Sequence, residues 1–364
     1  MFLELIFIFF SSFATLFLMR KVARHIGLVD TPNARKLHTG SIPLVGGISV
    51  CITLGHFILF KSEIIPNSGL FLSCIAFLTL LGALDDKFDL SFKVRMLCQA
   101  VLSIVMIKCG GLSLHFLGDM FGIGNVTFEA FWISAIVTTL AVIGAINAFN
   151  MVDGIDGLLG GLSVVTFGAI AILLNLDNQL GLAYLCLVIV VSMIPYICMN
   201  LGLLGRTRKV FMGDAGSMLI GFSVIWILLS ASQISRESGE ALMRPVTALW
   251  LIALPLMDMA AIMIRRIRRG HSPFKPDREH LHHICQRLGL GSKQTLIAIC
   301  SIATLFACFG IYGEVRNIPE VVMFGLFMVS FVIYSLTLNY IWRITTFVRS
   351  KVGRDSEITK SNAT

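Results

Sequence analysis

Charge is scarce in this sequence. Asp, Glu, Lys and Arg make up 14% of the 364 residues, whereas hydrophobic side chains make up 56%. A soluble globule of this size needs more polar surface than that composition supplies. The shortage excludes a soluble enzyme, and the mean hydropathy of +0.85 indicates an integral membrane protein instead.

Signals for cysteine pairing and for nucleic-acid binding are missing as well. None of the nine cysteines has a metal or disulfide spacing, and most lie in or beside apolar runs, where a thiol behaves as a small hydrophobic group. The net charge of +8 arises from short basic clusters between long apolar runs. That pattern is typical of membrane topology, so we expect a lipid bilayer around the chain and no nucleic-acid partner.

Apolar runs long enough to cross a bilayer are abundant. A spanning helix needs roughly 20 mostly apolar residues, and about eleven such runs predict an all-α integral membrane protein. No basic residue precedes the first run, and Arg20, Lys21 and Arg24 follow it, which places the N-terminus outside and argues against a cleaved signal peptide. The expected spans are 2–19, 44–60, 68–84, 96–114, 131–149, 158–175, 180–199, 215–232, 245–264, 294–313 and 319–342.

The basic residues test this topology. With the N-terminus outside, 24 of the 29 Lys and Arg residues fall in inside segments and 5 in outside loops, as the positive-inside rule requires. We therefore expect one polytopic domain over 1–342 and a disordered cytoplasmic tail over 343–364. The expected cytoplasmic loops, which hold the candidate site residues considered next, are 20–43, 85–95, 147–157, 200–214 and 265–293.

The loop 85–95 opens with a D-D-x-x-D pattern formed by Asp85, Asp86 and Asp89. Three carboxylates in five residues can hold Mg²⁺ together with a substrate phosphate, because this hard cation prefers oxygen ligands. A solvated, charge-balanced loop is the alternative.

The loop 147–157 has no basic residue but carries Asn147, Asn150, Asp153 and Asp156. If the fifth span continues here as a helix, the first three of these residues stack loosely along one face. Burying such groups at a membrane edge is costly without partners. A helix cap explains only one of them, so the loop favours a metal or nucleotide site.

Asp214 stands at the start of the eighth span, just after a basic run. A metal-bridged phosphate would meet free backbone N–H groups at such a helix start, although a simple N-cap is the alternative. Phe211 is suited to stack on a nucleobase, but an interfacial Phe needs no ligand to explain it.

The loop 265–293 combines arginines with Arg278, His280, His282 and His283. These donors suit a diphosphate or a sugar better than zinc, because no Cys or carboxylate at familiar spacing completes a zinc site. Four arginines directly after the ninth span, from Arg265 to Arg269, fit topology and anionic lipid contacts.

Three further features leave alternatives open. Lys36 and His38 lie between turn formers in the first inside loop, and the pair Gly46–Gly47 allows either close helix packing or a re-entrant bend. Asp258, inside the ninth span, either pairs with a neighbouring helix or faces the polar cavity.

The combination of loops discriminates between functions. Carboxylates and amides for Mg²⁺, cations for phosphates and a lipid-embedded surface predict a site where a polyanionic donor meets a lipid acceptor. A transporter or flippase usually has ionisable groups near the bilayer midplane and internal repeats, which are not evident here. A non-catalytic nucleotide-sugar sensor would not need Asp85, Asp86 and Asp214 together.

The ordered motifs between about residues 30 and 290 resemble those of the polyprenyl-phosphate N-acetylhexosamine-1-phosphate transferases, a family with about ten or eleven spans. The matching motifs are Arg35-Lys36-x-His38 with Pro43 and Gly46-Gly47, Asp85-Asp86-x-x-Asp89, Asn147-x-x-Asn150-x-x-Asp153-Gly154-x-Asp156-Gly157, Gly213-Asp214-x-Gly216-Ser217 and His280-Leu281-His282-His283.

The resemblance implies transfer of GlcNAc-1-phosphate from UDP-GlcNAc to undecaprenyl phosphate, giving undecaprenyl-diphosphate-GlcNAc and UMP. The histidine loop is similar to the UDP-GlcNAc branch, which begins O-antigen and enterobacterial common antigen (lipopolysaccharide) synthesis at the cytoplasmic face of the bacterial inner membrane. UDP-GalNAc and UDP-MurNAc-pentapeptide are the alternative donors. The resemblance also implies Mg²⁺, with Mn²⁺ as a substitute, and we expect a homodimer.

The resemblance further implies roles for single residues. Asp214 and Asn150 would ligate the metal, and the expected catalytic residues are Asp85, Asp86, Asp153 and Asp156. The expected substrate-binding residues are Lys36, His38, Arg95, Asn147, Asp156, Phe211, Arg278, His280, His282 and His283.

The acceptor itself points to a mechanism. A phosphate monoester has a second pKa near 6, so roughly nine-tenths of the lipid phosphate is dianionic at pH 7. We therefore expect direct attack on the β-phosphorus of the donor, with UMP leaving and Mg²⁺ neutralising charge. Asp85 or Asp86 would orient the acceptor or take the proton of its monoanionic minority; the alternative is an Asp nucleophile and a phospho-enzyme.

Overall fold

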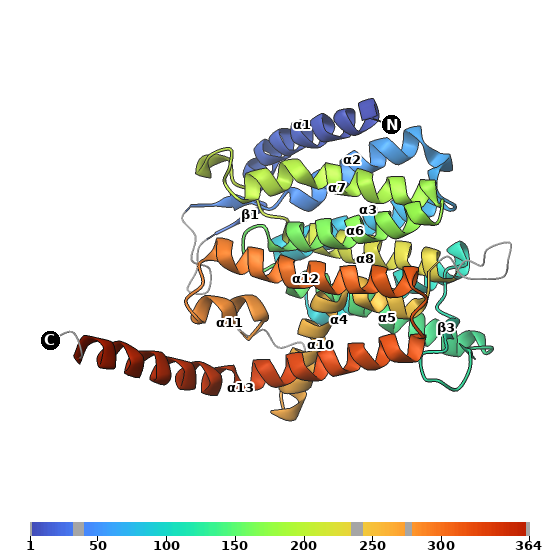
Figure 1. The fold of residues 1–364 in the computed structure, drawn as a ribbon. Coiled ribbons are helices and arrows are strands. Elements are labelled where there is room, and N and C mark those ends of the chain that lie inside the picture. The colour runs from blue at the N-terminus through green and yellow to red at the C-terminus, as the bar shows by residue number, and fades with distance from the viewer. Residues whose placement is uncertain (1, 32–39, 234–242, 274–278, 362–364) are drawn as a thin grey trace.

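The computed structural model describes residues 2–31, 40–233, 243–273 and 279–361, and this part of the chain is mostly helical (Figure 1). Lys36, His38 and Arg278 lie outside it. The helices are α1 (Phe2–Ile26), α2 (Gly46–Phe60), α3 (Ser68–Phe88), α4 (Phe92–Gly110), α5 (Phe131–Met151), α6 (Leu158–Leu176), α7 (Leu180–Asn200), α8 (Gly213–Gln233), α9 (Pro245–Leu251), α10 (Ala253–Arg268), α11 (Leu281–Arg287), α12 (Ser292–Val315) and α13 (Glu320–Ser361).

Short strands and 3-10 turns join the helices. Strand β1 (Val29–Asp30) pairs with β2 (Ile42–Pro43), and β3 (Phe116–Gly118) pairs with β4 (Val126–Thr127), both antiparallel. Two 3-10 turns, η1 (Ser62–Ile64) and η2 (Arg206–Arg208), precede α3 and α8. These ribbons are small additions to the expected helical architecture.

Eight of the described helices are long and apolar enough to cross a membrane, and α9 with α10 makes a ninth if the two halves form one bent span. This confirms a helical, multi-pass membrane protein. Helix α2 is apolar but only 15 residues long, and α4, which carries Lys93, Arg95 and Lys108, is not among the eight. The count of eleven spans stays a prediction.

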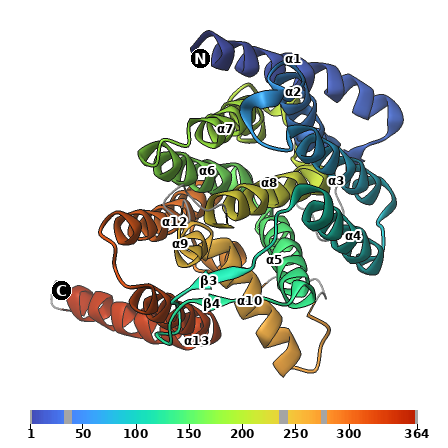
Figure 2. The ribbon, with the colours of Figure 1, turned by 90° about the vertical axis from the view of Figure 1, so that its right-hand side faces the viewer.

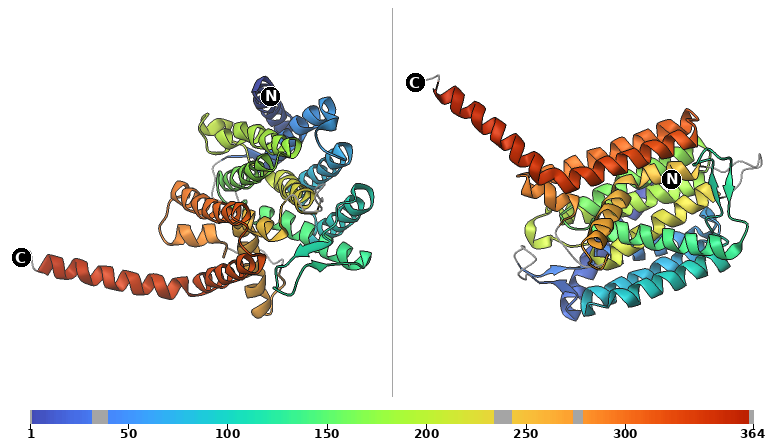
Figure 3. Two further views of the ribbon diagram at one scale, coloured as in Figure 1. Left: turned by 45° about the vertical axis from the view of Figure 1, so that its right-hand side comes forward. Right: turned by 90° about the horizontal axis from the view of Figure 1, so that it is seen from below.

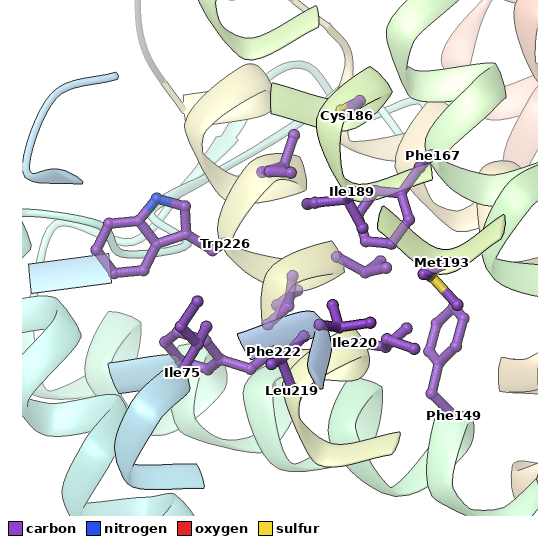
Figure 4. Packing of buried hydrophobic residues seen from close by; sticks show 14 of the residues in the cluster. Ile75, Phe149, Phe167, Cys186, Ile189, Met193, Leu219, Ile220, Phe222 and Trp226 are labelled. Carbon is purple, nitrogen blue, oxygen red and sulfur yellow. The ribbon is translucent and has the colours of Figure 1, made fainter. Parts of the chain in front are cut away.

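Helix α8 forms the centre of the bundle, with the other helices around it (Figure 2). Of its 21 residues all except Asp214 are buried. Its side chains Phe222 and Trp226 belong to one buried cluster with Phe167 of α6 and Met193 of α7 (Figure 4). Because lipid tails are as apolar as these side chains, close packing between helices stabilises the bundle more than hydrophobic burial does.

The first turn of α8 lies against the backbone of α2. A Cβ atom on Gly47 would lie 2.1 Å from the amide nitrogen of Gly216, so the two helices approach as only glycine allows. The backbone N–H groups of Val45 and Gly46 donate to the carbonyl of Phe211 at 3.2 and 2.9 Å. The Gly46–Gly47 pair therefore serves close helix packing, the first of the two predicted alternatives.

The two ends of the bundle differ. The turn 89–91 after α3, the turns 152–157 and 201–212, and the segment 279–291 with α11 meet at the end that carries β1, which we call the polar end. The β3–β4 ribbon lies at the opposite end (Figure 1). Helix α10 departs from α9 at 82°. Helix α13 extends beyond the polar end as a helix to Ser361, where we expected a disordered tail (Figure 3).

Candidate active site

Two adjoining cavities open at the polar end, with volumes of about 770 Å³ and about 290 Å³. Asn150, Gly154 and His283 line both. Every predicted site residue in the described part of the chain lines one of them, except Asp85, which contacts a lining residue. The larger cavity adds Asp86, Asp153, Asp156, Lys209, Phe211 and Asp214, and the smaller adds Arg95, Asn147, Arg266, His280 and His282.

The carboxylate of Asp86 lies at the N-terminus of α8. One oxygen accepts the N–H of Asp214 at 2.9 Å and the other accepts the N–H of Ala215 at 3.3 Å. A negative charge here satisfies free N–H groups and opposes the positive end of the helix dipole. Gly213 has a φ of +74°, and a Cβ atom there would lie 2.3 Å from Asp86 Oδ2, so the approach requires glycine.

Arg95 bridges two of the predicted carboxylates. Its Nη1 lies 2.5 Å from Asp85 Oδ2 and 3.2 Å from Asp214 Oδ2. The side chain of Asp85 is only 3% exposed, and a buried carboxylate needs such a partner. Arg95 thus connects α3, α4 and α8. The third carboxylate of the motif, Asp89, is exposed at the C-terminus of α3 and lines neither cavity.

Asn150 holds Asp214 from the side of α5. Its Nδ2 donates to Asp214 Oδ1 at 2.7 Å and to the hydroxyl of Ser217 at 2.8 Å. Both bonds use the amide nitrogen, so the carbonyl oxygen is the atom of Asn150 that can ligate a metal. The two predicted metal ligands are therefore neighbours, brought together from positions 64 residues apart in the sequence.

Asp153 follows α5 and does not continue it, because the helix ends at Met151. It lies in the turn beyond the helix and lines the larger cavity. Its side chain is exposed to the cavity; partial desolvation there and the negative charges of Asp214, Asp86 and Asp156 raise the pKa of its carboxyl to about 7. A cation in the cavity would relieve this repulsion.

Asp156 is held by the basic run before α8. Lys209 Nζ lies 2.6 Å from Asp156 Oδ2 and 5.2 Å from the centroid of the Phe211 ring. The loop without basic residues thus receives its counter-charge from another loop, and the same cation rests on an aromatic face. Phe211 lines the larger cavity, where the predicted stacking on a base is geometrically open.

The histidines line the side of the site nearest α10. His280 Nδ1 lies 2.7 Å from the carboxylate of Asp258, so Asp258 pairs with a neighbouring element and thereby supports the cavity wall. The rings of His282 and His283 have centroids 4.2 Å apart. Burial lowers the pKa of His282 to about 3, and the charges of His283 and His280 add to this effect. His282 is therefore neutral at physiological pH.

Two neighbouring residues escaped the sequence analysis. Asn200 accepts the N–H of Gly157 at 2.6 Å and donates to the carbonyl of Val210 at 2.9 Å, so it fixes two loops of the larger cavity. Gln99 accepts a bond of 3.0 Å from Asn147 Nδ2. Neither residue belongs to a motif; the only signal was an amide within or directly after a predicted membrane span.

Arg266 was assigned to topology, but the structure places it in the wall of the smaller cavity. It is 5% exposed, and its Nη1 donates to the carbonyl of Pro273 at 2.5 Å. A buried guanidinium beside His280 and His282 adds positive charge for a phosphate. Its place in a run of four arginines concealed this position.

The donor set fits a hard cation. Among the described residues no group of three or more His, Cys, Asp or Glu side chains is arranged to hold a metal ion by itself. Mg²⁺ usually takes one or two carboxylates and completes its shell with phosphate oxygens and water, which suits Asp214 and Asn150 in a cavity that also holds Asp86 and Asp153.

Comparisons with known proteins agree with this geometry. Residues 68–232 match the glycosyl transferase family 4 model. The chain is 51% identical to the undecaprenyl-phosphate alpha-N-acetylglucosaminyl 1-phosphate transferase of Yersinia pestis and 49% identical to that of Escherichia coli (strain K12), over 95% of this chain and 93% of each relative. It is 46% identical to the protein of the same name from Haemophilus influenzae, over 97% of this chain and 98% of that relative.

Proposed function

The chain belongs to the undecaprenyl-phosphate alpha-N-acetylglucosaminyl 1-phosphate transferases of glycosyl transferase family 4, and we propose that it transfers GlcNAc-1-phosphate from UDP-GlcNAc to undecaprenyl phosphate. The products are undecaprenyl-diphosphate-GlcNAc and UMP. The observation that carries the proposal is that carboxylate, amide and basic side chains from separate loops line adjoining cavities at one end of an apolar bundle.

Mg²⁺ would be held by Asp214 and Asn150 together with the donor diphosphate, and Mn²⁺ would substitute. When bound, the ion supplies charge neutralisation for the phosphates. Asp86 and Ser217 position these ligands, because Asp86 caps the helix that carries Asp214 and Ser217 accepts a bond from Asn150.

Direct displacement suits the arrangement better than a phospho-enzyme. An oxygen of the lipid phosphate bonds to the β-phosphorus of UDP-GlcNAc, and the bridging oxygen leaves with UMP. Asp86 already accepts two backbone N–H groups, one on each oxygen, and Asp85 is buried and paired with Arg95, which disfavours either carboxylate as a nucleophile. Arg95 beside the smaller cavity orients the acceptor phosphate.

The basic residues favour a cytoplasmic polar end in the bacterial inner membrane, since 24 of the 29 Lys and Arg residues fall in the segments predicted to lie inside. In this orientation the enzyme meets soluble UDP-GlcNAc and delivers its product to O-antigen and enterobacterial common antigen synthesis. In a cysteine-free background, an impermeant thiol reagent should label Asp119→Cys in intact cells but Gln286→Cys only after permeabilisation. The reverse pattern would invert the topology. A homodimer stays a prediction.

Purified protein tests the function directly. With undecaprenyl phosphate and Mg²⁺, UDP-GlcNAc should release UMP faster than UDP-GalNAc or UDP-MurNAc-pentapeptide does. Uptake into vesicles without UMP release would favour a transporter. Covalent capture of sugar phosphate on the protein with donor alone would overturn direct displacement.

A further inference from the structure

Asp258 collects three hydrogen bonds behind the smaller cavity. Its Oδ2 lies 2.7 Å from Nδ1 of His280, while its Oδ1 accepts the hydroxyl of Tyr334 at 2.6 Å and the backbone N–H of Leu281 at 3.1 Å. Asp258 is 2% exposed. Since Asp258 belongs to α10, Tyr334 to α13 and His280 to the start of α11, one carboxylate joins three elements.

This arrangement fixes the state of the His280 ring. The hydroxyl of Tyr334 and the N–H of Leu281 both donate to this carboxylate, which fits its ionised form, and an ionised carboxylate only accepts hydrogen bonds. The His280 proton therefore lies on Nδ1, and Nε2 is the nitrogen left for a ligand. The ring is held from its face as well, because it lies parallel to the ring of His282 at an interplanar angle of 4° and a centroid distance of 5.8 Å.

Packing alone does not explain the hydroxyl group of Tyr334. Its neighbours Val332 and Ile333 are 50% and 59% exposed on the outer face of α13, whereas Tyr334 reaches inward to Asp258. A phenylalanine would fill the same space. The hydroxyl specifically restrains Asp258 Oδ1 and so prevents rotation of the carboxylate that His280 contacts.

We propose that Asp258 and Tyr334 are positioning residues that hold His280 with Nε2 toward the diphosphate of the sugar donor. The inference rests on the function proposed above and adds α13, the last helix, to the support of the site. The competing explanation is that Asp258 merely ties α10, α11 and α13 together. The two explanations differ in whether the loss of Tyr334 acts through His280.

A double-mutant cycle of Tyr334→Phe and His280→Ala separates them. Tyr334→Phe should lower kcat/KM for UDP-GlcNAc by about 3- to 10-fold, the worth of one hydrogen bond, and by less than about 2-fold in the His280→Ala background. Tyr312→Phe, at a tyrosine that is 56% exposed on α12, is the matched control and should change neither. An equal loss with and without His280, or no loss at all, overturns the proposal.

Two additions keep the test decisive. If His280→Ala has no measurable turnover, the same cycle is read as the affinity for UDP-GlcNAc by calorimetry, with the same criterion. Asp258→Asn should lower kcat/KM more than Tyr334→Phe does, because the amide of Asn can place an N–H group against the Nδ1–H of His280. An Asp258→Asn variant as active as the native protein overturns the proposal. Failure of the native protein to release UMP would instead count against the proposed function.

Discussion

Asp86 accepts the backbone N–H of Asp214 at 2.9 Å, so the D-D-x-x-D motif holds the residue that we propose as a metal ligand. The two positions are 128 residues apart in the sequence. Through this bond the end of α3 fixes the start of α8. The contact indicates that Asp86 positions Asp214, in addition to any contact that Asp86 makes with the substrate.

Two replacements of Asp86 should distinguish its role as a helix cap from the effect of its negative charge. Asp86→Ala should lower stability by about 0.5–2 kcal/mol, the usual cost of losing an N-cap, while Asp86→Asn keeps one acceptor and should lose less. Both should lose most of their activity because Asp214 is no longer held. Thermal unfolding in detergent and UMP release measure the two effects. Equal stability of the Ala and Asn variants would contradict the capping geometry.

Asp214→Asn tests the metal site. Removing the charge should raise the Mg²⁺ concentration for half-maximal UMP release by at least about ten-fold, and EDTA should abolish activity of the native protein. Asp119→Asn makes the same chemical change at the opposite end of the bundle, where Asp119 accepts the N–H of Gly124, and should leave the Mg²⁺ response unchanged. An unchanged Mg²⁺ response of Asp214→Asn would remove Asp214 from the ligand set.

Asp153 should give the metal-free protein a distinct pH dependence. Its carboxyl has a pKa of about 7 in the folded state against an ordinary value of 3.8, so between these values the folded state binds more protons than the unfolded state does. Stability in EDTA should therefore fall as the pH rises from about 4 to 7 and level off above that. Asp153→Asn should lose less stability than the native protein between pH 5 and pH 8; parallel melting curves would contradict the raised pKa.

Gly154 should not accept a side chain. A Cβ atom there would lie 2.0 Å from Nε2 of His282, a side chain that is 3% exposed and has little room to move. Overpacking of this kind costs about 1–3 kcal/mol, so Gly154→Ala should be less stable and displace the histidines, with a loss of activity. Gly168→Ala in α6 meets nothing within 4 Å and should be neutral or stabilising by about 0.5–1 kcal/mol. Similar behaviour of the two variants would refute this packing argument.

The sequence alone was enough to indicate candidate site residues where polar side chains lie beside apolar membrane spans and need polar partners. Asn150, Asp153 and Asp214 were singled out because carboxylates and amides beside membrane spans need partners, and the structure places all three in the wall of the larger cavity. The pairing between loops was not predictable, since Arg95 reaches Asp214 across 119 positions and no periodicity encodes such a contact.

Residues without a motif were missed for a different physical reason. Tyr334 stands in an apolar run, where a tyrosine normally needs no partner, and its hydroxyl gains meaning only when α13 packs near Asp258. Arg266 was missed because it lies in a run of four arginines that is typical of a membrane-topology signal. The continuation of α13 to Ser361 was also unexpected, because a short polar tail carries no hydrophobic period to predict a helix.

The central place of α8 has a consequence for biosynthesis. Chains emerge from the ribosome N-terminus first, yet the helix that touches α2, α3 and α5 through their backbones or close neighbours is made only after α7. Until residue 214 has been translated, Asp86 has no helix to cap and Asp85 shares Arg95 with no second carboxylate. The packing of α2, α3 and α5 around α8 can therefore be completed only after α8 has been inserted. The site forms late in synthesis for the same reason.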